Sequence, residues 1–253
     1  MTFRVCTKLE VKESNLIKGI QLEGLRVLGN VFEFASDYYS AGIDEILIID
    51  VTSSWFSQNS VISHVAQELR ECFVPLTIGG GLRRLSDVDS CLRSGAERVS
   101  LNTTIFENPK ITSLISEKYG AQAVVFNLQA RLIDSKFYCF TDNGRENTGM
   151  TIDEIFNLVD SNSIGEILLT SIDYDGTLRG VDEKLLTYTR SITDLPIMYS
   201  GGVSCIDDVE MVLNLGANAI AISSAFHYER LRVQEVKSEL LRRGHAIRGI
   251  EDD

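Results

Sequence analysis

Eight short apolar runs recur along the chain, and amphipathic segments separate them. The runs are rich in β-branched residues and continuous rather than alternating, which is typical of strands that are covered on both faces. We therefore predict eight buried parallel strands, at residues 3–11, 45–51, 75–79, 98–102, 123–130, 166–172, 196–201 and 219–223.

Helical periodicity occupies the segments between these runs, most clearly at residues 60–73, 86–95, 207–216 and 230–244. Two of these segments begin with capping-type residues and end at Gly95 and Gly216, and glycine suits the left-handed conformation that follows a helix. Strand and helix patterns alternate, so we predict repeated βα units.

An internal repeat decides how these units are arranged. VPLTIGGGLRRLSDVDSCLRSGAERVSLNTTIF, from Val74, aligns without a gap with LPIMYSGGVSCIDDVEMVLNLGANAIAISSAFH, from Leu195, 121 residues later. An internal repeat constrains the fold more directly than other features of a sequence do. We predict an α/β fold, a single (β/α)8 TIM barrel domain over residues 1–253, built from two fourfold half-barrels at about 1–120 and 121–253. A doubly wound open sheet is the alternative, and the head-to-tail repeat favours the closed barrel.

Charge and cysteine content narrow the function classes. The 36 acidic and 24 basic side chains give a formal net charge of −12 at pH 7, which argues against a general nucleic-acid or membrane-surface binder. Five scattered cysteines form no CxxC pair, so we predict reduced thiols and no metal or cofactor. No signal peptide or apolar span of ~20 residues is recognisable, so we expect a cytoplasmic protein.

Glycine turns follow two predicted strands at matching places in the repeat. Gly79 to Gly81 follow the third strand and Gly201 to Gly202 the seventh, while Asn102-Thr103 and Ser223-Ser224 end the fourth and eighth. In such barrels the active site lies at the carboxyl ends of the strands, where glycine lets backbone NH groups approach an anion. A lone glycine pair more often makes only a tight turn. Its recurrence in both halves favours two phosphate sites and a long ligand with a phosphate at each end.

Titratable side chains gather at the same rim of the predicted barrel. The carboxylates are Glu10, Asp50, Asp173 and Asp175, and the cations of the first loop are Lys12 and Lys18. An isolated Asp-Gly dipeptide such as that at Asp175 is more often a turn former. For the two lysines, ligand contact and simple solvation are equally good interpretations. His227 follows the last strand, but a single histidine is more often a packing residue than a catalyst.

The chain resembles the cyclase subunit of imidazole glycerol phosphate synthase, the (β/α)8 barrel called HisF. The likeness covers nearly the whole chain, through KLEVKESNLIKGI, PLTIGGG, GAERVSLNT, EILLTSIDYDGT, YSGG and AISSAFH. It implies a partner, a glutamine amidotransferase subunit of the HisH type, docked at the amino-terminal face of the barrel and delivering ammonia along its axis. It also implies a substrate with two phosphates, bound on one side by Gly81, Asn102 and Thr103 and on the other by Asp175, Gly176, Gly202, Ser223 and Ser224.

Four charged residues lie at or just before the starts of predicted strands: Arg4, Glu45, Arg98 and Glu166. In a barrel they would ring the amino-terminal mouth, and the resemblance implies an ammonia gate at these positions. Charges at strand starts are also common as plain stabilising pairs, worth ~0 to 1 kcal/mol when exposed. The match at all four positions favours the gate.

The chain departs from the HisF pattern where protons are expected to move. The resemblance implies aspartates as general acid and base at the ends of the first and fifth strands, and this chain has Glu10 and Gln129 there. An amide cannot exchange protons near neutrality, and losing a placed acid or base costs ~10² to 10⁴ in rate. Lys8 replaces a small residue, and it either brings a cation near the barrel interior or extends outward. The candidate catalytic positions are Glu10, Gln129, Lys18 and Asp175.

These departures predict a diverged HisF-like enzyme subunit that receives ammonia from its amidotransferase partner and adds it to a phosphorylated substrate. Glu10 would serve as the proton acceptor. Paralogues of this appearance suggest amidino modification of a surface-glycan sugar. Two alternatives remain, the genuine cyclase subunit of histidine biosynthesis and a noncatalytic barrel that activates a glutaminase. The paired phosphate sites argue against the noncatalytic barrel, because a scaffold has no use for them.

Overall fold

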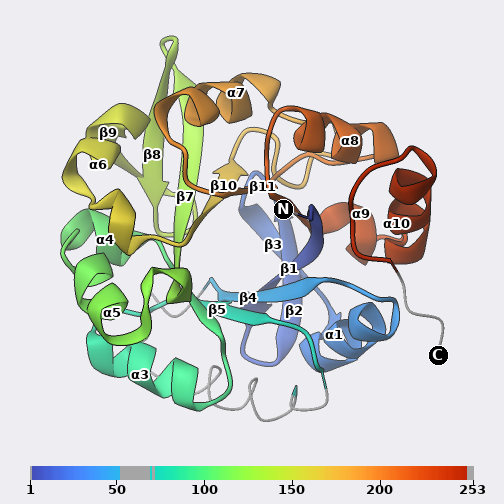
Figure 1. Ribbon diagram of the computed structural model, residues 1–253, viewed down its shortest axis with the longest axis horizontal. Helices are drawn as coiled ribbons and strands as arrows, with labels where there is room; N and C mark the ends of the chain where they lie inside the picture. The colour runs from blue at the N-terminus through green and yellow to red at the C-terminus, as the bar shows by residue number, and fades with distance from the viewer. Residues whose placement is uncertain (1, 52–68, 70–71, 250–253) are drawn as a thin grey trace.

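The centre of the computed structural model is a closed barrel of eight parallel strands with helices around it (Figure 1). The structure describes residues 2–51, 69 and 72–249. The barrel strands are β1 (Arg4–Lys12), β4 (Glu45–Asp50), β5 (Leu76–Gly79), β6 (Arg98–Leu101), β7 (Val124–Ile133), β10 (Glu166–Ser171), β11 (Ile197–Ser200) and β12 (Ala219–Ile222). They pair in this order, and β12 pairs with β1. The predicted (β/α)8 fold is confirmed, and each predicted run overlaps one barrel strand.

The helices follow the barrel strands along the chain. They are α1 (Val31–Ser40), α3 (Leu85–Arg93), α4 (Thr103–Glu107), α5 (Ile111–Tyr119), α6 (Ile152–Leu158), α7 (Glu183–Ile192), α8 (Ile206–Asn214), α9 (Ser224–His227) and α10 (Val233–Arg242), with 3-10 turns at Ala121–Ala123 and Ser161–Ser163. Gly95 and Gly216 follow α3 and α8 with φ of 111° and 86°, as predicted. The predicted helix at 60–73, which contains His64, lies mostly outside the described residues. None of the described helices is long and apolar enough to cross a membrane.

Two antiparallel hairpins extend the barrel at its carboxyl end. The first consists of β2 (Asn15–Ile20) and β3 (Glu23–Asn30) and pairs with β1, and the second consists of β8 (Lys136–Thr141) and β9 (Glu146–Thr151) and pairs with β7. The first hairpin contains the predicted first loop, and no strand is predicted in either segment. β3 and β9 have no buried side chain, so no apolar pattern announces them.

Side chains of the barrel strands alternate between the barrel interior and the layer beneath the helices. An apolar cluster fills the interior: Cys6, Leu47, Val125, Leu168, Met198, Ala219 and Ala221. On β1, Arg4, Cys6, Lys8 and Glu10 share one face, since they are two residues apart. The interior therefore changes along the axis from a charged floor, through an apolar layer, to charged groups at the carboxyl end.

Candidate active site

Four buried charged side chains meet at the carboxyl end of β1. Lys18 Nζ lies 2.9 Å from Glu10 Oε2 and 2.6 Å from Asp175 Oδ1. Lys8 Nζ lies 3.0 Å from Glu10 Oε1 and 3.4 Å from Asp175 Oδ2. Each of these side chains is at most 4% exposed. Two ammonium groups and two carboxylates thus alternate in a closed arrangement without net charge, which we call the charge quartet.

Three elements bring the charge quartet together. Lys8 and Glu10 stand two residues apart on β1, and β2 folds back antiparallel on β1 so that Lys18 points inward. Asp175 follows β10, where its backbone carbonyl accepts a hydrogen bond of 2.7 Å from the Gln21 NH at the tip of the first hairpin. The hairpin that the sequence did not reveal therefore completes the site.

The two lysines change the proton affinity of Glu10. Burial alone would raise its pKa, but Lys18 and then Lys8 outweigh burial and lower the pKa to about 2. For Lys18, burial is likewise outweighed by Asp175 and Glu10, so its pKa is raised. Near neutrality both groups are charged. Glu10 is therefore a weak proton acceptor while both lysines contact it.

Other candidates at the rim are not members of the charge quartet. Lys12 is exposed, as expected for simple solvation. Asp173 pairs with Arg131 at 3.0 Å near the surface. His227 is buried, and its Nδ1 shares a hydrogen bond of 2.7 Å with the Tyr38 hydroxyl. Burial, together with Lys18, lowers the pKa of His227 to about 3, so it is a neutral packing residue.

A first pocket at the carboxyl end contains the residues expected on one side of the substrate. Gly81, Asn102 and Thr103 line it, together with Gln129. The Asn102 side chain donates to the Asn127 and Phe140 backbone carbonyls at 2.9 and 3.0 Å, so its amide group joins β7 to β8. Asp142 and Asn143, after β8, also line this pocket, and the sequence analysis did not anticipate them.

A second pocket contains the residues expected on the other side. It is lined by Lys18, Asp175, Gly176, Gly202, Ser223 and Ser224, among others. The Asp175 carboxylate is engaged with the two lysines. The Ser223 hydroxyl donates to the Lys8 backbone carbonyl at 2.8 Å, whereas Ser224 Oγ is buried without a partner among the described residues. Ser224 and the Lys18 ammonium are thus the side chains best placed to meet an anion here.

Close backbone contacts explain the glycines beside both pockets. Gly80 has φ of 101°, and a Cβ there would lie 2.1 Å from the Asp50 carbonyl oxygen. Gly202 has φ of 80°, and a Cβ there would lie 2.0 Å from the Gly180 carbonyl oxygen. Packing alone requires glycine at these two positions, so these glycines by themselves do not indicate a bound phosphate.

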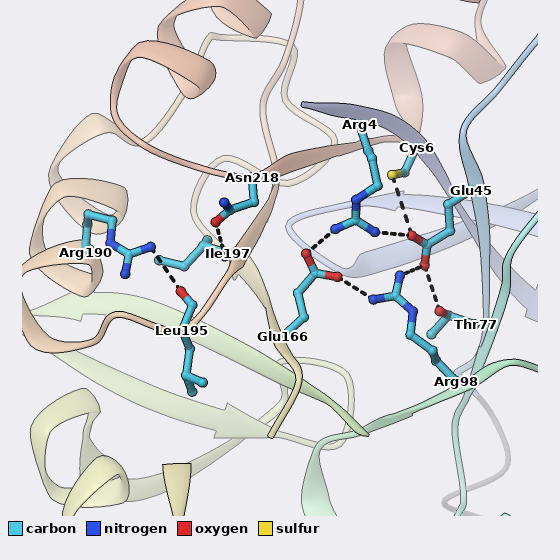
Figure 2. A network of polar contacts seen from close by, with 10 residues as sticks. All are labelled: Arg4, Cys6, Glu45, Thr77, Arg98, Glu166, Arg190, Leu195, Ile197 and Asn218. Carbon is cyan, nitrogen blue, oxygen red and sulfur yellow. Dashed lines mark hydrogen bonds and ion pairs between the residues drawn. The ribbon is translucent and has the colours of Figure 1, made fainter. Parts of the chain in front are cut away.

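A ring of ion pairs closes the opposite end of the barrel. Figure 2 shows Arg4 and Arg98 alternating with Glu45 and Glu166, and each arginine contacts both glutamates. Arg4 Nη1 lies 2.6 Å from Glu45 Oε2, and Arg98 Nη1 lies 2.5 Å from Glu166 Oε2. Burial raises the pKa of Glu45, and Arg98 and Arg4 only partly oppose that shift. We call this arrangement the floor ring.

Comparison with known proteins shows the family to which this chain belongs. The family model described as "Histidine biosynthesis protein" matches residues 4–232. Imidazole glycerol phosphate synthase subunit HisF of Legionella pneumophila is 39% identical over 206 residues, 81% of this chain and 97% of that protein. The proteins of the same name from Bifidobacterium longum (strain DJO10A) and Thermotoga sp. (strain RQ2) are 35% and 34% identical, over 98% and 97% of this chain and 99% and 97% of their own lengths. The chain belongs to the HisF family.

Gln129, where the resemblance to this family predicts a carboxylate, lies within β7. Its side chain is 5% exposed, and its Oε1 has no hydrogen-bond partner among the described residues. β7 is four strands away from β1 in either direction around the barrel. Gln129 therefore faces the charge quartet across the mouth and offers no proton to it.

The alternation of side-chain directions along β1 already predicts which way Lys8 points. Arg4 and Glu10 were expected to face the barrel interior, and Lys8 has the same parity on the same strand. It follows that Lys8 also points inward, and the structure places it there at 3% exposure. Outward extension, which the sequence analysis left open, is not what this side chain does.

Proposed function

We propose that this HisF-family subunit receives ammonia from a glutamine amidotransferase partner and adds it to a phosphorylated substrate without closing an imidazole ring. The reaction serves amidino modification of a surface-glycan sugar. One observation carries this proposal: Gln129 stands where a second proton-transfer group is needed, while Lys8 and Lys18 hold the remaining carboxylate, Glu10, ionised.

The floor ring supports delivery of ammonia through the amino-terminal end of the barrel. Its glutamates are at most 3% exposed, and each lies between two arginines, so the ring is a plug across the barrel axis. Ion pairs can separate and reform, and ammonia is small and neutral. The relatives named above are each called a subunit of a synthase, which agrees with a glutaminase partner of the HisH type at this face.

The two pockets support a substrate with two phosphates. They lie at the carboxyl ends of strands on different sides of the barrel, β5 and β6 for the first and β11 and β12 for the second. The charge quartet and Gln129 are at the edges of these pockets, since Lys18 and Asp175 line the second and Gln129 the first. A substrate bound at both ends would place its middle over the reacting groups.

The chemistry asks for one proton acceptor during ammonia addition. Ammonia attacks a carbon that is doubly bonded to oxygen or nitrogen, and the π bond breaks as the C–N bond forms, so that its electron pair moves to that oxygen or nitrogen. The incoming nitrogen is then positively charged and releases a proton. Glu10 accepts this proton once the substrate has separated it from Lys8 or Lys18. Closing an imidazole ring needs further proton transfers on the opposite side, and the Gln129 amide cannot perform them.

The cyclase subunit of histidine biosynthesis is the second candidate. The names of the relatives favour it, because all those given above are imidazole glycerol phosphate synthase subunits. It requires that Glu10 works from inside the charge quartet and that a water molecule replaces the missing group at Gln129.

Deleting the gene from its source organism tests the proposal. We expect growth without added histidine, together with a surface glycan that lacks its amidino nitrogen by mass spectrometry. A histidine requirement would establish the second candidate, and an unchanged glycan would contradict the proposed role. Returning the gene with Gln129→Asp serves as a matched variant, since it restores a carboxylate at the same position.

A different assay distinguishes the proposed enzyme from a noncatalytic barrel that only activates a glutaminase. In that case the amidotransferase partner would hydrolyse glutamine faster with the barrel present, and no small-molecule product would take up nitrogen from glutamine labelled at its amide. Transfer of the label to a product supports the proposed function.

A further inference from the structure

Four buried polar oxygens in the barrel interior have no hydrogen-bond partner among the described residues. They are Ser100 Oγ on β6, Asn127 Oδ1 and Gln129 Oε1 on β7, and Thr170 Oγ1 on β10. Each of these residues is more than nine-tenths buried. Native proteins pair nearly all such atoms, because an unpaired one away from water is costly. Their concentration on three adjacent strands therefore calls for a ligand.

The strand register places these oxygens on one wall of the barrel. Thr170 is the register partner of Gln129, and Ser100 is the partner of Val125, two residues before Asn127. Ser100, Asn127 and Gln129 also line the first pocket. We call these four residues the acceptor wall. It faces the charge quartet, since β7 and β1 are opposite each other in the strand order.

The chemistry of the acceptor wall selects its ligand. An amide oxygen only accepts hydrogen bonds, and a hydroxyl can accept as well as donate. A carboxylate or phosphate could accept from the NH2 groups of these two amides, but it would leave Asn127 Oδ1 and Gln129 Oε1 without a donor. A group with several N–H donors satisfies both oxygens. The phosphate expected in the first pocket must then lie toward Gly81 and Thr103.

We propose that Gln129 is a specificity-determining residue whose Oε1 accepts a hydrogen bond from an N–H of the substrate group that receives ammonia. Asn127 and Thr170 accept further hydrogen bonds from the same group. That group is an amide or an amidine, in which the C=O or C=N π bond opens as ammonia adds, and it is favoured over a carboxylate. This inference rests on the proposed function for the reaction and adds the chemical class of the reacting end.

Small probes test this selection without knowledge of the substrate. The full chain, labelled with ¹⁵N, is titrated with acetamide, acetamidinium chloride and sodium acetate while the Asn127 side-chain amide signals are followed by NMR. We expect acetamide and acetamidinium to bind at least about tenfold more tightly than acetate. In Gln129→Leu the affinity for acetamide should fall about tenfold, as for one buried hydrogen bond.

Two further variants check that the binding differences come from the Gln129 side chain. Gln129→Glu, of the same shape but charged, should prefer acetamidinium to acetamide, and Gln122→Leu, at an exposed glutamine, should bind like the unaltered chain. Without probes, Gln129→Leu should raise the urea midpoint, because it removes an unpaired buried amide. Equal binding of acetate and acetamide, unchanged binding by Gln129→Leu, or a lowered midpoint would each overturn the inference. None of these results depends on turnover, so they stand or fall separately from the gene-deletion test.

Discussion

At the scale of single residues, Lys8 sets the net charge of the charge quartet. Without it, Glu10 and Asp175 would share the one cation of Lys18, and the buried centre would carry a net negative charge. Buried charges in a low-dielectric interior are tolerated when they are paired and hydrogen-bonded. Lys8 therefore neutralises the centre and at the same time weakens Glu10 as a base.

Lys8→Met tests this role through pH. Because the folded pKa of Glu10 is lowered from 4.5 to about 2, its ionised form contributes stability above pH 4.5 that is lost as the pH falls toward 2. At pH 7 we expect Lys8→Met to lose about 3 kcal/mol of unfolding free energy, since a buried carboxylate loses a partner. The difference in unfolding free energy between the two proteins should shrink between pH 5 and pH 3. The unaltered chain loses the contribution of ionised Glu10 over this range, whereas the variant has less of that contribution to lose.

Urea unfolding across this pH range measures the effect. Lys12→Met is the matched control, since Lys12 is exposed on the same strand, and its effect should stay within about 0.5 kcal/mol. A Lys8→Met difference that is independent of pH would show that Lys8 does not control the ionisation of Glu10.

At the scale of elements, a buried ion pair joins the last helix to the barrel. Lys237 Nζ on α10 donates to Asp44 Oδ1 and to the Gly42 carbonyl, both at 2.7 Å. Asp44 Oδ2 in turn accepts the Val5 backbone NH of β1 at 2.8 Å. The chain end and the first barrel strand are thus connected through one carboxylate just before β4.

Lys237→Met should therefore destabilise the barrel by about 3 kcal/mol, because Asp44 would remain buried without its cation. Chemical denaturation measures the loss. Lys118→Met provides the exposed counterpart, since Lys118 pairs with Asp89 at the surface, and that change should leave the free energy of unfolding nearly unchanged. Equal losses from the two variants would mean that the Lys237 pair is no more than a surface contact.

The sequence could reveal the elements of the barrel because each strand is a continuous apolar run, and the repeat then indicated closure. It could not reveal the two hairpins, since β3 is largely exposed and has no regular pattern. The first hairpin places Lys18 in the charge quartet, so the residues that form this site could be known only from the tertiary structure. Gln129 and the floor ring were recognisable because they occur at the ends and starts of predicted strands.

At the scale of the whole molecule, the barrel has two neutral charged layers separated by an apolar one. The floor ring has two arginines and two glutamates, and the charge quartet has two lysines and two carboxylates. Between them lie apolar side chains such as Leu47 and Met198. A neutral molecule such as ammonia meets no net charge along this axis, whereas an ion would have to lose its water without a partner.

The floor ring should behave as one coupled unit. Arg98→Leu should cost about 3 kcal/mol in unfolding free energy, since Glu45 and Glu166 remain buried with a single arginine between them. The double variant Arg98→Leu with Glu166→Leu should cost less than the single one, because the Arg4 and Glu45 pair is left intact. Additive losses in urea unfolding would show that the four charges are independent.

The central claim is that this HisF-type barrel lacks the proton-transfer pair for imidazole ring closure. The most direct measurement is turnover of the histidine-pathway ribonucleotide by the purified chain in the presence of an ammonium salt. We predict that the unaltered chain is slower by about 10² to 10⁴ than Gln129→Asp, in which a titratable group occupies this position of β7. Turnover by the unaltered chain at the rate of that variant would contradict the account.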